Sequence, residues 1–410
     1  MIKGFMLGVV LLPLGASFAV DTNLLNSWVR NTTGETGYDG IETNVQVVQY
    51  DDDYVYVSST GIPDYEIGPW DRNPNTPTNQ NSVTRFPKSA SKSSVVKYTG
   101  LGAIGMWKNG VAIFNPKDGQ YWNNSSQNFS NGVTTSGWNR NALYFEGISF
   151  DACLGHPNGK GAYHHHVSPN CLYDITDSSN HSPIIGYAFD GYPIYGGYGF
   201  TNTNGTGSVK RMESSFVLSM ATSRIDGSPV NSNYPLSSMC EDYIYTQGVG
   251  DLDEHNGRFS VTPEYPEGTY AYFTTLTETL SPAFPFVVGP TFYGTLAPGS
   301  EGPNNTAQTI PGNTVVYTDG ITSVKVVSVQ SEVSVDMGES GEFLFLTLSN
   351  ESVNNLKATL YDSRGVVVQS LNNMHPSLSY FMPIGDIASG NYSLVLQSES
   401  ERWVKSIHKP

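Results

Sequence analysis

The chain has 410 residues, with 21 Lys and Arg against 37 Asp and Glu, and a formal net charge of −16. A chain this acidic repels phosphate backbones and attracts cations, so we do not expect nucleic acid as a partner. Its length suits two or three domains, and its many Asn, Ser, Thr, Gly and Tyr residues favour short strands joined by turns. We therefore expect a mainly β fold.

The residues 1–19 have the layout of a secretory signal peptide. Lys3 supplies the positive charge, an apolar run extends from Phe5 to Leu14, and Ser17-Phe18-Ala19 offers a cleavage site. The apolar run is too short for a membrane anchor, and no later stretch qualifies as a transmembrane segment. The sequence thus predicts a protein that is exported through the periplasm and is then secreted or held at the cell surface.

Strand patterns dominate the region 20–296. Val45–Val57 alternates in the manner of two short strands around an acidic turn, and Asn109-Gly110 is a hairpin signal between apolar segments. Gly61–Asn81 is rich in Pro, Asn and Asp and should be irregular, whereas Phe216–Arg224 has some helical character. We expect an irregular β-rich domain with short helices, its core at about 100–294.

The C-terminal part of the chain changes in character. The composition of Ala297–Gln308 predicts a linker, which we extend over 297–320. From Ile321 onward, period-two alternation and regular turn signals predict about seven strands. A small β-sandwich at 321–410 is the simplest interpretation.

Histidines are concentrated in one segment, because five of the eight lie between His156 and His181. His164 and His166 should project from the same face of an extended segment, with His165 on the opposite face. Two imidazoles so placed are half of a typical zinc or copper site, and the candidates to complete it are His156, His181, and Asp151 or Asp190. The alternative is that these histidines only hydrogen-bond to backbone carbonyls and brace loops.

Other polar residues near this segment have candidate roles. Asp151 and Asp190 are candidate acceptors that orient histidine ligands, and Tyr163 is a candidate hydrogen-bond donor or pocket wall. Glu254 and Asp190 are candidate general bases beside a metal-bound water. The alternatives are ordinary turns at Asp190-Gly191 and around Glu254, and a tyrosine that simply packs a strand.

The three cysteines are an odd number for an exported chain. Cys153 and Cys171 bracket the histidine-rich segment and are the natural candidates for a disulfide bond, although their spacing alone does not fix the pairing. Cys240 is then left over, as a small buried residue.

The central region resembles the YHYH-domain family, whose motif stands here as Tyr163-His164-His165-His166. Further similar segments are G-L-G-A-I-G-M-W-K-N-G-V-A-I-F-N-P, D-A-C-L-G-H-P, H-S-P-I-I-G-Y-A-F-D-G-Y-P-I-Y-G and G-D-L-D-E-H-N-G-R, within about 45–294. Two positions depart from the family pattern: His165 replaces the second aromatic residue, and His255 stands where a cysteine is usual. The resemblance implies metal binding through the motif but no particular reaction.

The last ninety residues or so resemble the C-terminal sorting domain of proteins that leave Bacteroidetes cells by the type IX secretion system. The similar stretches are A-T-L-Y-D-S-R-G-V-V-V-Q-S and D-I-A-S-G-N-Y-S-L-V-L-Q, with a basic end V-K-S-I-H-K. This resemblance implies the type IX machinery as a partner. The alternative is an immunoglobulin-like spacer module.

Together these features favour a secreted protein that binds copper or zinc through its histidines. One alternative is a metal-free module whose Tyr-rich loops bind an extracellular glycan or other polymer. Another is a metal-dependent hydrolase.

Overall fold

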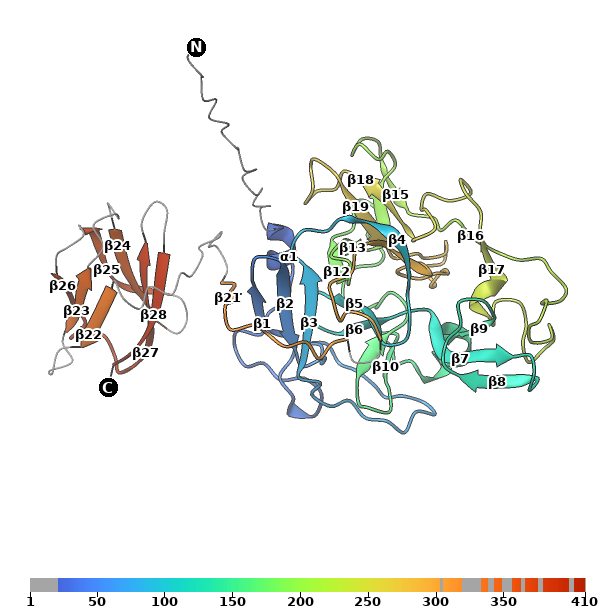
Figure 1. Cartoon of the computed structure of the whole chain (residues 1–410), viewed down its shortest axis with the longest axis horizontal. Helices are drawn as coiled ribbons and strands as arrows, with labels where there is room; N and C mark the ends of the chain where they lie inside the picture. The colour runs from blue at the N-terminus through green and yellow to red at the C-terminus, as the bar shows by residue number, and fades with distance from the viewer. Residues whose placement is uncertain are drawn as a thin grey trace, which may run out of the picture. The chain divides into compact units, whose positions relative to one another are not determined.

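The computed structural model describes residues 21–302, 305–318, 333–337, 343–348, 356–362, 366–374, 379–397 and 402–409. Two compact units are present, Met1–Tyr317 and Thr318–Pro410 (Figure 1). The predicted signal peptide at 1–19 lies outside the described residues. The fold is mainly β, as expected. The helical elements are α1 (Thr22–Asn26), α2 (Ala142–Phe145) and the 3-10 turns η1 (Tyr38–Gly40), η2 (Gly147–Ser149) and η3 (Cys240–Asp242).

An eight-stranded mixed sheet forms the centre of the first unit. In spatial order its strands are β10 (Gly155–Pro157), β11 (Tyr163–His165), β6 (Ala112–Phe114), β5 (Ala103–Trp107), β12 (Ile184–Ala188), β13 (Pro193–Tyr195), β19 (Thr269–Phe273) and β18 (Gly257–Ser260). Every residue of β5, β12 and β13 is buried, which explains why these strands are almost continuously apolar in sequence. Strands β10 and β11 lie at one edge of this sheet.

The predicted hairpin at Asn109-Gly110 is confirmed, since β5 and β6 pair antiparallel on either side of it. Gly110 has a φ of +83°, and a Cβ there would lie 2.5 Å from Ser59 Oγ, so the turn requires glycine. This hairpin sets the place of β6, the strand against which β11 then pairs in parallel.

A four-stranded sheet contains the two strands predicted around the acidic turn. Its members are β1 (Val45–Tyr50), β2 (Tyr54–Ser59), β3 (Ser82–Pro87) and β21 (Val315–Val316). The turn is stabilised by Asp51, whose carboxylate accepts hydrogen bonds from the backbone of Asp53 and Tyr54. Strand β21 falls within 297–320, where composition predicts a linker, so this segment is part of the first unit as far as Tyr317.

Smaller sheets complete the first unit. They are formed by β7 (Lys117–Asn123), β8 (Asn128–Asn131) and β9 (Asn139–Asn141), by β14 (Tyr198–Phe200) and β15 (Val209–Arg211), by β16 (Phe216–Leu218) and β17 (Tyr243–Tyr245), and by β4 (Lys92–Tyr98) and β20 (Thr291–Gly294). The expected helical character around Phe216–Arg224 is wrong, because β16 pairs there with β17. The irregular segment 61–81 is confirmed, since it contains no helix or strand.

The second unit is built from two antiparallel sheets. Their strands are β22 (Val333–Met337), β23 (Phe343–Leu348), β24 (Leu356–Tyr361), β25 (Val367–Met374), β26 (Ser379–Pro383), β27 (Gly390–Gln397) and β28 (Arg402–Lys409). Leu344 and Leu346 of one sheet share a core with Ala358, Leu360 and Leu394 of the other. This is the sandwich arrangement that the alternating pattern predicts.

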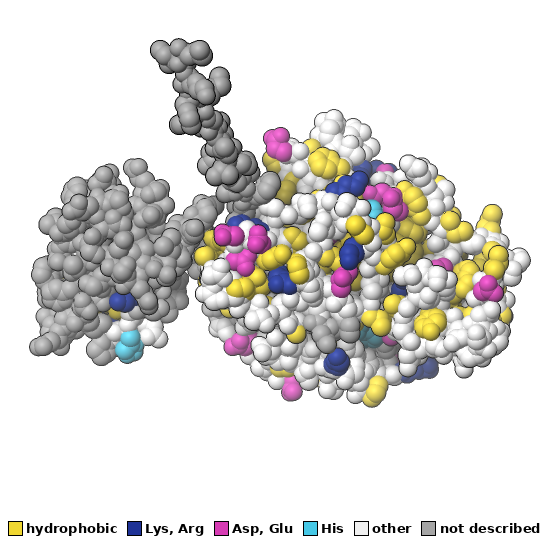
Figure 2. Space-filling view, in the orientation of Figure 1, with side chains coloured by type: hydrophobic (Ala, Val, Ile, Leu, Met, Phe, Trp, Pro, Cys, Tyr) yellow, Lys and Arg dark blue, Asp and Glu magenta, His cyan; other side chains and the backbone are white. Residues whose placement is uncertain are grey.

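Few charged side chains appear on the face of the first unit drawn in Figure 2, and only small parts of its histidines reach this surface. Among the residues that the structure describes, no helix combines the length and apolar character needed to cross a membrane.

Candidate metal site

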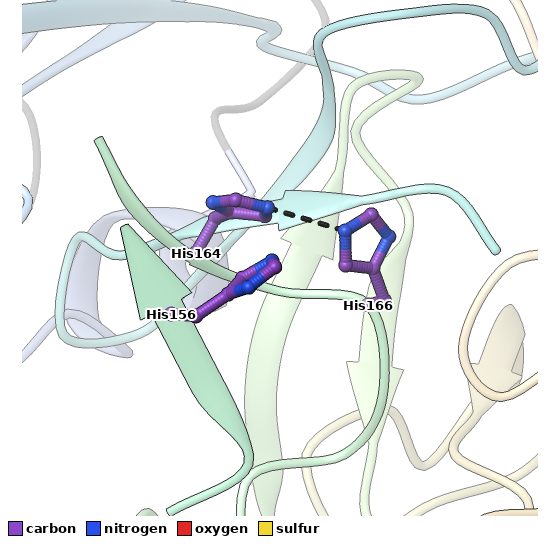
Figure 3. Close-up of side chains that lie close together, drawn as sticks. All are labelled: His156, His164 and His166. Atoms are coloured by element: carbon purple, nitrogen blue, oxygen red, sulfur yellow. Dashed lines mark hydrogen bonds between the residues drawn. The ribbon is translucent and has the colours of Figure 1, made fainter. Parts of the chain in front are cut away.

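Three histidines meet at the edge of the central sheet (Figure 3). His156 in β10 is the direct cross-strand partner of His164 in β11, and His166 follows two residues later. Cross-strand partners and i, i+2 neighbours share one face of a sheet, so all three imidazoles project to the same side. Within the described part of the chain they form a group whose ligand atoms all lie within 4.8 Å of one another.

The Nδ1 atoms of His164 and His166 are held by backbone carbonyls. His164 Nδ1 lies 3.0 Å from the Ala162 oxygen, and His166 Nδ1 lies 2.6 Å from the Asn115 oxygen. Because a carbonyl oxygen can only accept, each Nδ1 carries a proton and donates it. In the neutral imidazole the Nε2 atom of each ring is therefore a lone-pair acceptor.

His156 is oriented in the same way by a serine. Ser149 Oγ donates to the backbone oxygen of Glu146 at 2.7 Å, and it lies 2.8 Å from His156 Nδ1. Since the single hydroxyl proton is already used, Ser149 accepts the bond from His156 Nδ1. The third Nε2 atom is thus also left as an acceptor.

In the neutral rings, the Nε2 atoms face one another without a proton to share. His164 Nε2 lies 3.2 Å from His166 Nε2, and His156 Nε2 is buried with no hydrogen-bond partner. Two lone pairs at this distance repel, and an unsatisfied buried acceptor costs free energy. A cation placed between the three nitrogens satisfies all of them.

The surroundings of the cluster are largely apolar. The ring of Phe114 stacks on His164 at 4.0 Å between centroids, and Phe150 lies 4.8 Å from His156. Burial, reinforced by the neighbouring His166, lowers the pKa of His156 to about 4 and that of His164 well below its usual value. Such imidazoles are neutral at physiological pH, which is the state that binds metal.

Glu146, a residue that the sequence analysis missed, lies against this cluster. Its Oε2 atom is 3.2 Å from His166 Nε2 and 3.8 Å from His156 Nε2. Burial alone would raise the pKa of this carboxyl, but His166, which donates to it when protonated, together with the charges of protonated His156 and of Arg140, brings the pKa below its usual value. No motif or spacing in the sequence marks Glu146, because it comes from the end of α2 and not from the histidine-rich segment.

A cavity of about 400 Å³ opens beside the imidazoles. Its polar walls come from loops and strand ends, among them Arg72, Asn73, Lys117, Asp118 and Asn158. Within this wall, Asp118 is paired with Arg140 at 2.6 Å. Desolvation nevertheless raises the pKa of Asp118 to about 6. Because His156, His164 and His166 also line this cavity, a small molecule can reach them from this side.

Tyr163 is a hydrogen-bond donor, as expected, but it and Asp151 contact each other and not the clustered imidazoles. Asp151 accepts hydrogen bonds from the backbone of Gly68, Cys153 and Gly155, and from the hydroxyl of Tyr163. That hydroxyl also lies 3.4 Å from His165 Nε2, on the face away from the cluster. These residues brace the turn before β10, while two backbone carbonyls and Ser149 orient the three histidines.

The predicted disulfide between Cys153 and Cys171 is present, with Cα atoms 5.3 Å apart. It joins the two ends of the segment that carries the histidine cluster. Cys240 is free and buried, as expected for the residue left over, and burial raises its pKa.

The structure places the remaining candidates apart from the cluster. The ring of His181 packs between Tyr195 and Phe200, and its Nδ1 atom donates to the oxygen of Ser182. The carboxylate of Asp190 accepts from Tyr272 and from the backbone of Gly294. His181 therefore does not contact the cluster, and Asp190 is a buried hydrogen-bond acceptor in the turn between β12 and β13.

Glu254, the other candidate base, is exposed and lies 3.9 Å from His255. The Nδ1 atom of His255 lies 2.7 Å from the hydroxyl of Thr291. Neither residue belongs to the group of three histidines, so the structure gives Glu254 no contact with the candidate metal ligands.

Residues 80–285, half of the chain, match the family model described as YHYH protein. This range contains all three clustered histidines and Glu146. No curated protein matches the chain.

Proposed function

Because this chain belongs to the YHYH protein family, we propose that its three clustered histidines bind a transition-metal ion, either copper or zinc. The observation that carries the proposal is the convergence of three Nε2 lone pairs. Each ring is fixed through Nδ1, so in the neutral imidazoles all three Nε2 atoms are free to donate a lone pair. Fixing the remote nitrogen in this way is how proteins orient histidine ligands.

The spacing of the nitrogens supports the proposal. Two imidazole ligands on one tetrahedral zinc ion, each at 2.0–2.1 Å from it, are separated by about 3.3 Å. The Nε2 atoms of His164 and His166 are 3.2 Å apart. Copper suits the same donors and is favoured by the Irving–Williams order, so the choice between the two ions depends on supply as well as affinity.

The test is the metal content of the purified mature protein. We expect about one equivalent of copper or zinc in the parent and almost none in the double variant His164→Ala/His166→Ala, measured by elemental analysis after dialysis. His181→Ala is the matched control, because it removes a histidine of the same segment that lies outside the cluster. Equal metal in the parent and the double variant would contradict the proposal.

We further infer that the protein is exported and that its C-terminal sandwich is a sorting domain read by the type IX secretion machinery. The disulfide bond supports the first step, since such bonds persist in oxidising compartments. The seven strands in the described part of the second unit, and its resemblance to sorting domains, support the second. In a Bacteroidetes host, deletion of 318–410 should leave the protein in the periplasm, as detected by fractionation. Normal release of the shortened chain would contradict this inference.

A further inference from the structure

The carboxylate of Glu146 lies beside two of the three clustered histidines, just outside the group that they form. Its Oε2 atom is 3.2 Å from His166 Nε2 and 3.8 Å from His156 Nε2. Ligands on one tetrahedral zinc ion lie about 3.3 Å from each other. If the carboxylate contacted only a metal-bound water, it would lie farther from the metal by the length of one hydrogen bond, about 2.7 Å.

The chain segment that carries Glu146 is well fixed. Asn141 caps the start of α2 by accepting a hydrogen bond from the Leu143 backbone, and Glu146 follows the last residue of this short helix. The backbone oxygen of Glu146 accepts from Ser149, the residue that orients His156. One turn of chain therefore positions both a carboxylate and the Nδ1 acceptor of a histidine.

In the described part of the chain, the ion-pair contacts of the Glu146 carboxylate are those with His156 and His166. Asp118 is the second acid that lines the cavity, and it is paired directly with the guanidinium of Arg140. Glu146 instead faces imidazoles, which are neutral ligands when they bind metal. Three neutral nitrogens and one carboxylate leave a divalent ion with a single net positive charge, which lowers the cost of burying it.

We propose that Glu146 is the fourth protein ligand, so that the site is a centre of three histidines and one carboxylate, built from His156, His164, His166 and Glu146. This rests on the metal binding proposed above and adds a ligand from a separate element. A hard oxygen donor favours divalent ions such as Zn²⁺ and Cu²⁺ over Cu⁺, which prefers softer ligands. The 400 Å³ cavity, which Glu146 also lines, then admits a small molecule as an additional ligand.

The test compares Glu146→Gln with the parent, using Zn²⁺ in competition with a chromophoric chelator and the visible absorption of bound Co²⁺. We expect the Zn²⁺ affinity of E146Q to fall at least about tenfold, because losing a direct ligand costs no less than losing an outer partner. The Co²⁺ absorption should also change in position or intensity, since it reports the donor set.

Two control variants separate a ligand from a nearby charge. Asp118→Asn removes an acid from the same cavity, and Glu254→Gln removes an exposed acid away from the cluster; both should keep the parent's affinity and Co²⁺ spectrum. Equal losses in D118N and E146Q would overturn the proposal, as would an unchanged spectrum in E146Q. Absence of metal from the parent itself would instead refute the proposed function, and thermal unfolding of each variant confirms that it is folded.

Discussion

At the scale of single residues, Asp190 is a carboxyl buried away from water in the turn between β12 and β13. It is fully buried and accepts hydrogen bonds from Tyr272 at 2.6 Å and from Gly294 at 2.8 Å. Desolvation outweighs these bonds and raises the pKa of Asp190 to about 6, from 3.8. Between these two values the folded chain holds a proton that the unfolded chain has lost.

This difference predicts the direction of a pH effect. Because the folded state binds more protons, Asp190 makes the protein less stable as the pH rises from 3.8 to about 6, by about 3 kcal/mol in total. The variant Asp190→Asn lacks this titration. The difference in unfolding free energy between parent and variant, measured with denaturant at pH 4 and pH 7, should therefore shift against the parent at pH 7. A constant difference would contradict the buried, protonated carboxyl.

At the scale of elements, the β10–β11 hairpin places two of the three histidines. Gly155 sits where this hairpin meets Asp151, and a Cβ on it would lie 2.4 Å from the ring and hydroxyl of Tyr163 and 2.8 Å from His165 Nε2. Tyr163 is almost fully buried, and its hydroxyl donates to Asp151. The packing therefore leaves no space for a side chain at 155.

We expect Gly155→Ala to destabilise the protein by about 1–3 kcal/mol, because overpacking forces Tyr163 and the strand to shift. The control is Gly159→Ala in the turn of the same hairpin, where a Cβ would meet nothing within 4 Å. Thermal unfolding of the two variants should show a clear loss for the first and little change for the second. If both behave alike, the close approach at Gly155 is not a constraint on the hairpin.

At the scale of the whole molecule, most of the stretch whose composition predicts a linker belongs to the first unit. Asn305 is buried and donates to the oxygen of Ala103, and β21 pairs with the edge of β1. Tyr317 donates its backbone N–H to the oxygen of Val48. The stretch 297–317 therefore stabilises the first unit.

Two truncated chains test this boundary. A chain that ends at 317 should unfold cooperatively and keep the metal content of the full chain. One that ends at 296 should unfold at a lower temperature, because it loses β21 and leaves the Ala103 carbonyl without its buried donor. Calorimetry of both chains measures the difference. Equal melting temperatures would show that 297–317 contributes nothing to the fold.

The features that could be predicted from the sequence are local ones. His164 and His166 share a face because strand geometry alternates with period two, and the Asn109-Gly110 turn carries its own signal. The participation of His156 depends on the register between β10 and β11, and Glu146 is brought in by a different element. Neither follows from spacing.

The expectations for His181 and for Phe216–Arg224 differ from the structure because non-local strand pairing decides these positions. Nearness in sequence groups His181 with the other histidines, yet it precedes β12, which lies beyond β6 and β5 in the sheet. The helical character expected at Phe216–Arg224 is overridden by the pairing of β16 with β17, some 27 residues along the chain. Neighbourhood in sequence is a poor guide where a sheet partner decides the outcome.

The turn that connects β10 and β11 matters for the site because the register of these strands pairs His156 with His164. Because side chains alternate across a strand, a slip of one residue would turn His156 to the opposite face and pair it with Tyr163 or His165. The turn at 158–162 is held by Asn158, whose side chain accepts from the backbone of Lys160 and Ala162. A change in the turn that shifted this register by one residue would separate the histidines, so the turn bears on the site as well as the ligands do.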